Sequence, residues 1–184
     1  DRSLWDRCIT VGLPYVMFPT GYNNNVRITQ AKGYVVIAHE MIHDMRVIPL
    51  DGRPHLSPKI RHYMGDSRGR WEGNTLVVDV TNFTDRTWPV GHGAPPEGAP
   101  ASAISTGHGV FQSEALHVVE RFTPKGDVIQ YEATIEDPNV FTRPWKISMP
   151  LYRRLEKNVQ LLEFKCVEFV EELMYGHLRK QAQP

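Results

Sequence analysis

Short runs of β-branched and aromatic residues, separated by glycine, proline, asparagine and aspartate, fill most of this chain. The clearest pair of runs, 70–72 and 75–80, flanks Gly73-Asn74, and a two-residue loop with glycine in first place is typical of a type II′ β-hairpin. About eight to ten such strands, joined by turns, predict a mainly β protein, an antiparallel barrel or sandwich with lipocalin-like architecture. The other candidate strands lie at 26–30, 34–48, 59–64, 117–123, 128–135, 143–152 and 159–165.

Three stretches depart from this strand pattern, although the length fits a single β domain over 1–184. Residues 1–21 show no long period and are predicted to form a packed N-terminal arm. Residues 88–109 are rich in Gly, Pro, Ala and Ser and predict a long loop. Residues 167–180 predict an amphipathic C-terminal helix of about three to four turns. Its apolar stripe, which would face the core or a partner, consists of Phe169, Val170, Leu173, Met174 and Leu178.

The charge balance argues against two classes of partner. The chain carries 21 lysine and arginine residues and 21 aspartate and glutamate residues, so no basic surface for nucleic acid or an anionic membrane is indicated. No apolar run approaches the roughly 20 residues that a membrane-spanning helix needs. We therefore expect no nucleic-acid partner and no transmembrane segment within this chain, and no motif indicates a cofactor.

Residues 39–43 spell H-E-x-x-H, which on a helix places two histidines on one face to bind zinc and a glutamate as general base. The neighbouring residues favour a strand instead. The run 34–48 begins with β-branched residues, its even positions are mostly polar from Glu40 to Arg46, and glycine and proline punctuate its ends. Residues 39 and 43 would then share one face of a strand.

The sequence also lacks a third zinc ligand at the spacing of known metallopeptidases. Arg46 and Pro49 occupy the places where a metzincin has glycine and histidine. We therefore disfavour a metallopeptidase. His39 and His43 are the candidate metal ligands, and a further histidine would have to complete the site.

The stretch that follows the second histidine is the best candidate for chemistry. It combines imidazoles, carboxylates and guanidinium groups with glycine and proline turns, a mixture that can support acid–base catalysis. The same side chains can satisfy backbone groups in turns and pair with one another. We favour this structural interpretation, because the sequence shows no recognisable Ser/His or Cys/His pair of a catalytic nucleophile and its base. The candidates are His43, Asp44, Asp51, Arg53, His55, Asp66 and Arg68.

Two cysteines, Cys8 and Cys166, lie near opposite ends of the chain. They are either two buried free thiols or one disulfide that joins the N-terminal segment to the last strand. A disulfide across so long a loop would stabilise the fold by about 4–5 kcal/mol in the chain-entropy model and would indicate an oxidising compartment. The residues alone leave both alternatives open.

Several motifs together resemble a family of bacterial proteins of unknown activity that are usually predicted to be exported. The motifs are EMIHD at 40–44, IPLDGRPH at 48–55, MGDSRGRWEGNTLVV at 64–78, ERFT at 120–123, DP at 137–138 and TRPW at 142–145. The resemblance implies a periplasmic or extracellular location, favours the Cys8–Cys166 disulfide and suggests that the chain is the C-terminal part of a longer product. The 88–109 loop and the 167–180 helix depart from the family pattern, so any special role would lie there.

Three functions are compatible with these features, and we favour the first. It is a non-catalytic structural or accessory subunit of a larger envelope or membrane complex, which contacts its partner through the 88–109 loop or the C-terminal helix. The second is a small-ligand-binding barrel, and the third is an enzyme of unknown class that uses the polar region 43–68. A ligand in such a barrel would contact Trp71, Tyr131, Trp145 and Met149, although these side chains more often fill a core.

Overall fold

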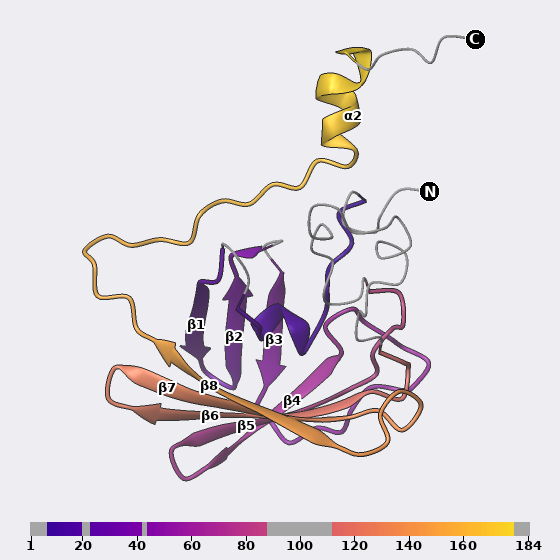
Figure 1. Ribbon diagram of the computed structural model, residues 1–184. Helices are drawn as coiled ribbons and strands as arrows, with labels where there is room; N and C mark the ends of the chain where they lie inside the picture. Colours follow the sequence, from indigo (N-terminus) through magenta and orange to yellow (C-terminus); the bar gives the residue numbers. More distant parts are fainter. Residues whose placement is uncertain (1–6, 20–22, 42–43, 88–111, 179–184) are drawn as a thin grey trace.

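The computed structural model describes residues 7–19, 23–41, 44–87 and 112–178. These residues form two antiparallel β-sheets and one short α-helix (Figure 1). The mainly β class that the sequence predicts is confirmed. The predicted 88–109 loop lies outside the described residues, as does the candidate site residue His43.

The strands follow one another in chain order within each sheet. The small sheet consists of β1 (Val26–Ala31), β2 (Tyr34–His39) and β3 (Met45–Pro49). The large sheet consists of β4 (Asp66–Glu72), β5 (Thr75–Thr81), β6 (His117–Lys125), β7 (Val128–Glu136) and β8 (Trp145–Tyr152). In the part of the chain that the structure describes, no pairing joins β3 to β4 or β1 to β8, so the two sheets do not close into one hydrogen-bonded barrel.

The β4–β5 hairpin forms as the sequence predicts. Glu72 pairs with Thr75 across Gly73-Asn74. The φ angle of Gly73 is +62°, the left-handed backbone that the first position of a type II′ turn requires. This register turns alternate residues of β5 to the inner face of the large sheet, where Val78 is fully buried.

The predicted single strand at 34–48 is instead two strands, β2 and β3, which pair antiparallel. β2 ends at His39, and the His39 N–H donates a hydrogen bond to the carbonyl oxygen of Asp44 at 2.9 Å. Directly after β2, the Glu40 N–H donates to the Asn25 carbonyl oxygen, and the Glu40 carboxylate accepts from the Asn25 amide. That residues 39 and 43 share a strand face stays a prediction, because residue 43 lies outside the described residues.

Two further strand predictions are wrong. Residues 59–64 begin in a turn closed by the Ile60 N–H on the Ser57 carbonyl at 2.8 Å, and beyond it there is only an isolated bridge between His62 and Phe83. Residues 159–165 run outside both sheets. Their hydrophobic pattern resembles that of a strand, but no neighbouring strand among the described residues pairs with them.

The hydrophobic core lies between the inner faces of the two sheets. Ile37 and Ile48 of the small sheet are fully buried in one cluster with Val78 of the large sheet. The N-terminal segment, which contains the 3-10 helix η1 (Tyr15–Met17), adds the fully buried Leu13 to the same cluster. Each such side chain contributes about 1.5–3 kcal/mol through burial, so the core holds the two sheets face to face.

A buried ion pair crosses this core. Arg46 of β3 is 3% exposed and Glu120 of β6 is fully buried. Arg46 Nη1 donates to Glu120 Oε1 at 3.0 Å, and Nη2 pairs with the other carboxylate oxygen. Ser67 Oγ accepts a further bond from Arg46 at 3.3 Å, and the Tyr131 hydroxyl donates to Glu120 at 2.9 Å. Because two-pronged guanidinium–carboxylate pairs fix orientation as well as distance, this contact sets the position of one sheet over the other.

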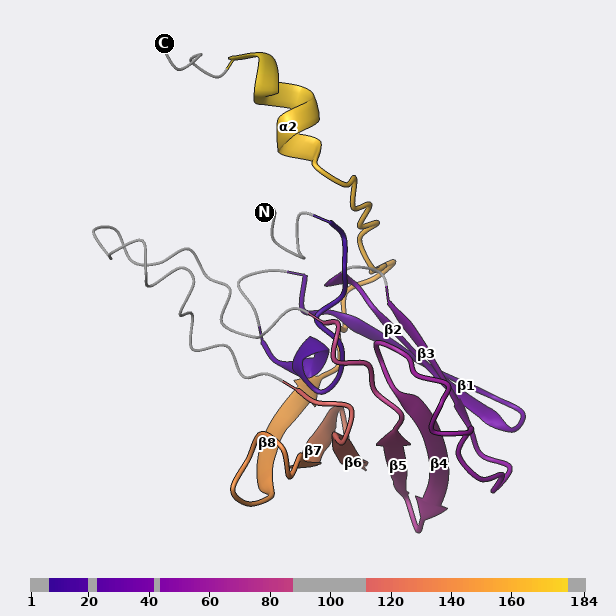
Figure 2. The same cartoon turned by 90° about the vertical axis from the view of Figure 1, so that its right-hand side faces the viewer.

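The C-terminal segment leaves the large sheet after Tyr152 and ends in α2 (Val170–Tyr175) and the 3-10 helix η3 (Gly176–Leu178). Figures 1 and 2 show α2 standing apart from both sheets. The helix begins later than the predicted 167–180, because Phe169 has a left-handed backbone with φ of +57°. No helix of the described residues is long and apolar enough to cross a membrane.

Cys8 and Cys166 form a disulfide. Of the two alternatives that the sequence left open, the structure therefore supports the bonded pair. Cys166 lies in the extended segment before α2 and not in a strand as expected. The bridge ties this segment to the N-terminal part of the domain.

Breaking the buried ion pair from one side is expected to destabilise the protein strongly. Glu120→Leu leaves the Arg46 guanidinium buried without its counter-charge, which costs about 3–5 kcal/mol of unfolding free energy. Combining Glu120→Leu with Arg46→Met and Tyr131→Phe removes the stranded polar groups together and is expected to recover most of this loss. Urea denaturation measures both variants, and a triple variant no more stable than the single one would contradict the assignment.

Candidate functional site

The H-E-x-x-H motif does not adopt its zinc-binding geometry at the first histidine. His39 is the last residue of strand β2, whereas the zinc site needs both histidines on one face of a helix. Asp44 lies directly before β3, and His43 lies outside the described residues. The described residues contain no group of three His, Cys, Asp or Glu side chains that could hold a metal ion.

Glu40, the general base of the zinc hypothesis, instead anchors the C-terminal segment. Its carboxylate accepts hydrogen bonds from Asn25 Nδ2 at 2.7 Å and from the Leu162 N–H at 2.8 Å, and the residue is 2% exposed. Burial acts to raise the pKa of Glu40. The hydrogen bonds from Leu162 and Asn25, helped by the Arg154 charge, outweigh burial and lower this pKa below its usual range. Glu40 is therefore ionised and already bonded at neutral pH.

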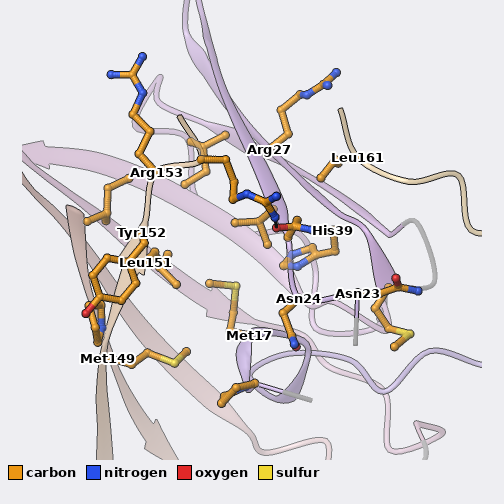
Figure 3. A pocket seen from close by; sticks show the side chains of 18 of the residues that line it. Met17, Asn23, Asn24, Arg27, His39, Met149, Leu151, Tyr152, Arg153 and Leu161 are labelled. Atoms are coloured by element: carbon orange, nitrogen blue, oxygen red, sulfur yellow. Dashed lines mark hydrogen bonds between the residues drawn. The ribbon is translucent and has the colours of Figure 1, made fainter. Parts of the chain in front are cut away.

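A cavity of about 630 Å³ lies between the two sheets, beside β1 and β8 (Figure 3). This volume falls within the range of small-molecule sites, about 300–1,000 Å³. The N-terminal segment, both sheets and the segment after β8 all contribute to its wall. The apolar side chains of this wall include Met17, Ile28, Ile129, Met149, Leu151 and Leu161.

His39 lines the same cavity (Figure 3). It is 3% exposed, and neither ring nitrogen has a hydrogen-bond partner among the residues that the structure describes. Burial, and then the positive charge of Arg46, lower the pKa of His39 to about 3. The ring is therefore neutral at neutral pH. A neutral imidazole carries one donor and one acceptor, and the described chain uses neither.

Charged side chains lie at the solvent end of the cavity. Its lining contains three arginines, Arg27, Arg153 and Arg154, and one acidic residue, Asp127. Arg153 pairs loosely with Asp127 at 3.5 Å, and Arg154 pairs with Glu156 at 2.9 Å. Arg27 has no ion pair among the described residues, so one guanidinium group remains to favour an anion at this end.

Of the four side chains predicted to contact a ligand in a barrel, Met149 lines the cavity. Tyr131 is instead fully buried, with its hydroxyl bonded to the core ion pair. Trp145 packs edge-on against another aromatic ring, and Trp71 is exposed near the end of the β4–β5 hairpin. Alternation along a strand identifies the face of a residue but not how far it lies from the open end of the sheet.

The side chains of the polar region predicted at 43–68 do not form one site but lie in separate groups. Asp51 and Arg53 pair with each other on the surface, and hydrogen bonding from Arg53 lowers the pKa of Asp51 to about 2. His55, Asp66 and Arg68 do come together. Asp66 Oδ2 lies 2.9 Å from His55 Nδ1, and Asp66 Oδ1 accepts from Arg68 Nη1 at 2.7 Å.

Two residues that the sequence did not single out, Asp79 and His117, extend this cluster across the outer face of the large sheet. Asp79 Oδ1 lies 2.5 Å from His117 Nε2, and Asp79 Oδ2 lies 3.7 Å from His55 Nε2. Strand register explains the meeting, since Arg68 and Asp79 are directly paired on β4 and β5. Counting back from Gly73-Asn74 would have revealed this pair. The cluster's imidazoles and carboxylates bond mainly to one another, which fits the structural interpretation.

No protein-family model, curated protein or solved structure matches this chain. The family resemblance in the sequence stays an expectation. Arguments about function therefore depend on the chemistry of the described residues, above all on His39 and its cavity and on the C-terminal segment that Glu40 holds.

Replacing Glu40 is expected to loosen the C-terminal segment while the sheets stay folded. In Glu40→Gln a neutral amide oxygen replaces the carboxylate at the Leu162 N–H, and hydrogen bonds to charged groups contribute about 1.5–3 kcal/mol. The Leu162 amide should then exchange with solvent at least about tenfold faster. Glu163→Gln, which changes an exposed glutamate in the same segment, is the matched control. Unchanged protection of Leu162 in Glu40→Gln would contradict this role.

Acid should release the same contact in the wild type. Because the folded pKa of Glu40 is lowered, its stabilisation is complete above the ordinary value of 4.5 and is lost as the pH falls through the lower folded pKa. After correction for intrinsic rates, Leu162 protection should fall in this range in the wild type. In Glu40→Gln it should not change with pH.

Proposed function

We propose that this protein is a non-catalytic β-domain that acts outside the cytoplasm as an accessory subunit of a larger complex. It contacts its protein partner through residues 153–178, here called the docking segment. The observation that carries the proposal is that this segment exposes large apolar side chains although it is tied to the domain at several points.

The apolar side chains of the docking segment are unusually exposed. Leu173 is 71% exposed and Leu178 is 69% exposed, and Leu155, Leu162 and Met174 are each more than half exposed. Helix α2, which carries two of them, lies away from both sheets (Figure 2). Single exposed apolar residues are ordinary, but a row of them on one segment is typical of an interaction surface.

The docking segment is nevertheless held in place. Near the start of the docking segment, Arg154 donates a hydrogen bond to the Asn25 side chain. In the middle of the segment, the Leu162 N–H donates to Glu40, and Cys166 forms the disulfide with Cys8. Such ties reduce the conformational entropy that binding must remove. α2 has only six residues, and isolated helices shorter than about 12–15 residues are marginal in water. Contact with a partner would therefore stabilise α2 as well as cover Leu173 and Met174.

The charges of the docking segment favour a protein groove over a lipid surface. Residues 153–178 contain five glutamates and four lysine or arginine residues, so the segment is not basic. Helices that lie on membranes carry mainly Lys and Arg on their polar face, and anionic lipids attract basic segments. The acidic residues Glu168 and Glu172 beside Leu173 instead suit an apolar groove with a basic rim. The 88–109 loop, the other predicted contact, lies outside the described residues.

The disulfide supports the proposed compartment. Protein disulfides persist in oxidising environments such as the periplasm and the extracellular space. The Cys8–Cys166 bridge agrees with the export that the family resemblance implies. We propose a periplasmic or extracellular location on these two grounds.

We also propose that the fold is a lipocalin-like barrel opened between β1 and β8 and between β3 and β4. Within each sheet every strand pairs with its neighbour in sequence, which is the connectivity of up-and-down barrels. The cavity lies beside β1 and β8, the two strands that would meet in a closed barrel. Ligand sites are common at the mouths of β-barrels.

Leu173→Asp is expected to abolish most of the partner affinity. Losing one fully buried leucine costs about 1.5–3 kcal/mol, and a buried carboxylate adds to this, so the Kd should rise at least about tenfold. The partner would be isolated by cross-linking and affinity purification from the native envelope fraction. The purified pair would then be titrated by calorimetry. Val47→Asp, at an exposed apolar residue of β3, is the matched control and should bind like the wild type.

Several outcomes would overturn the proposal. Equal partner affinity of the wild type and Leu173→Asp would exclude the docking segment. A wild-type dimer that Leu173→Asp converts to a monomer would make a second copy of the chain the occupant. Binding to vesicles of anionic lipid that Leu173→Asp abolishes would make a membrane surface the occupant.

A further inference from the structure

We infer that the cavity beside β1 and β8 binds a small apolar molecule that carries a hydroxyl group at one end and a carboxylate at the other. Helix α2, on which the docking proposal mainly depends, contributes no residue to the cavity wall among the described residues. Residues 153, 154 and 159–161 of the docking segment do line the cavity, but Leu173 does not. Leu173→Asp therefore tests docking without changing the ligand site, and the two proposals can fail separately.

His39 defines the hydroxyl end of the site. It lines the cavity, it is 3% exposed, and neither ring nitrogen is hydrogen bonded within the described chain. A buried polar group without a partner is unfavourable, so a ligand that satisfies it gains affinity. A hydroxyl group can donate to one imidazole nitrogen or accept from the other. The nearby Arg46 charge opposes protonation of the ring, which argues against a cationic ligand group at this end.

The arginine side chains define the carboxylate end. Arg27, Arg153 and Arg154 line the cavity together with Asp127. Arg153 is paired loosely with Asp127 and Arg154 is paired with Glu156, whereas Arg27 has no ion pair among the described residues. Figure 3 shows Arg27, Arg153 and His39 around the same cavity. Guanidinium groups bind carboxylates with matched, two-pronged geometry. An anionic group at the solvent end also keeps its charge hydrated, since the Arg153 side chain is largely exposed.

The wall between the two ends suits an aliphatic or alicyclic body. Ile28, Ile129 and Leu151 contribute branched apolar side chains from both sheets. Met17 and Met149 line the same space, and methionine side chains change rotamer readily to fit different shapes. Such adjustment lets a ligand reach the enclosed ring of His39.

Calorimetric titration of the full chain with ω-hydroxy carboxylates of increasing chain length tests the site. One chain length should bind best, and it should bind about tenfold or more tightly than the same carboxylate without its hydroxyl, because a site with unpaired polar groups rejects a ligand that leaves them unpaired. His39→Leu should remove this preference and leave the affinity for the plain carboxylate unchanged. The inference would be overturned if no member of the series showed saturable binding. It would also be overturned if His39→Leu still bound the hydroxy carboxylate more tightly than the plain carboxylate.

Two further readouts separate a ligand contact from a structural histidine. His39→Leu should raise the urea midpoint of the ligand-free protein, since it removes a buried polar group without a partner; a lowered midpoint would indicate a structural role and overturn the assignment. In the intact wild type, the ¹⁵N resonances of the His39 ring should shift with the hydroxy carboxylate and not with the plain one. Identical spectra with both ligands would also overturn it.

The carboxylate end is tested separately. Arg153→Gln should weaken binding of every carboxylate in the series, while the corresponding alcohols without a carboxylate bind it as they bind the wild type. Arg70→Gln, which changes an exposed arginine on β4 away from the cavity, is the control. Alcohols that bind the wild type as tightly as the hydroxy carboxylates would contradict the anionic end of the ligand. Leu173→Asp should leave all these affinities unchanged.

Discussion

The buried contact between Arg46 and Glu120 determines how the two sheets of this protein sit on each other. β3 and β6 belong to different sheets, so the pair joins the two inner faces across the core. Removing both charges from water is costly, and the cost is met by two-pronged geometry together with the Tyr131 hydroxyl and Ser67. Buried ion pairs often contribute little net stability. Here the pair chiefly selects one position of the small sheet over the large one.

The same arginine connects the core to the cavity. Arg46 and His39 both lie on the inner face of the small sheet, and both are buried. With burial as the larger cause, the Arg46 charge keeps the His39 ring neutral and its pKa near 3. The group that positions the sheets thus also helps burial to keep the most buried polar side chain of the cavity wall neutral. The edge strands β1 and β8 stay unpaired with each other, which leaves the space that His39 lines.

Local signals in the sequence were sufficient for part of this fold. Gly73-Asn74 fixes a hairpin and its register, and the strands at 117–123, 128–135 and 143–152 appear as β6, β7 and β8. The failures involve contacts between residues distant in sequence. Glu40 bonds to Asn25 and Leu162, which no local pattern reveals. The cluster of Asp79 and His117 with His55 and Asp66 was also not predicted. These residues are far apart in the sequence, and only the strand register brings them together.

Amide hydrogen exchange on the intact, disulfide-bonded protein tests most directly whether the sheets are held together through the core and are unpaired between β1 and β8. The amides of β5 and β6 around Glu120 should exchange slowest, through global unfolding. The outward-facing amides of β1 and β8 should exchange orders of magnitude faster, since no strand covers either edge among the described residues. Slow exchange of these edge amides at the rate of β5 and β6 would mean that β1 and β8 pair in a closed barrel. It would contradict the opening between β1 and β8 on which the ligand site depends.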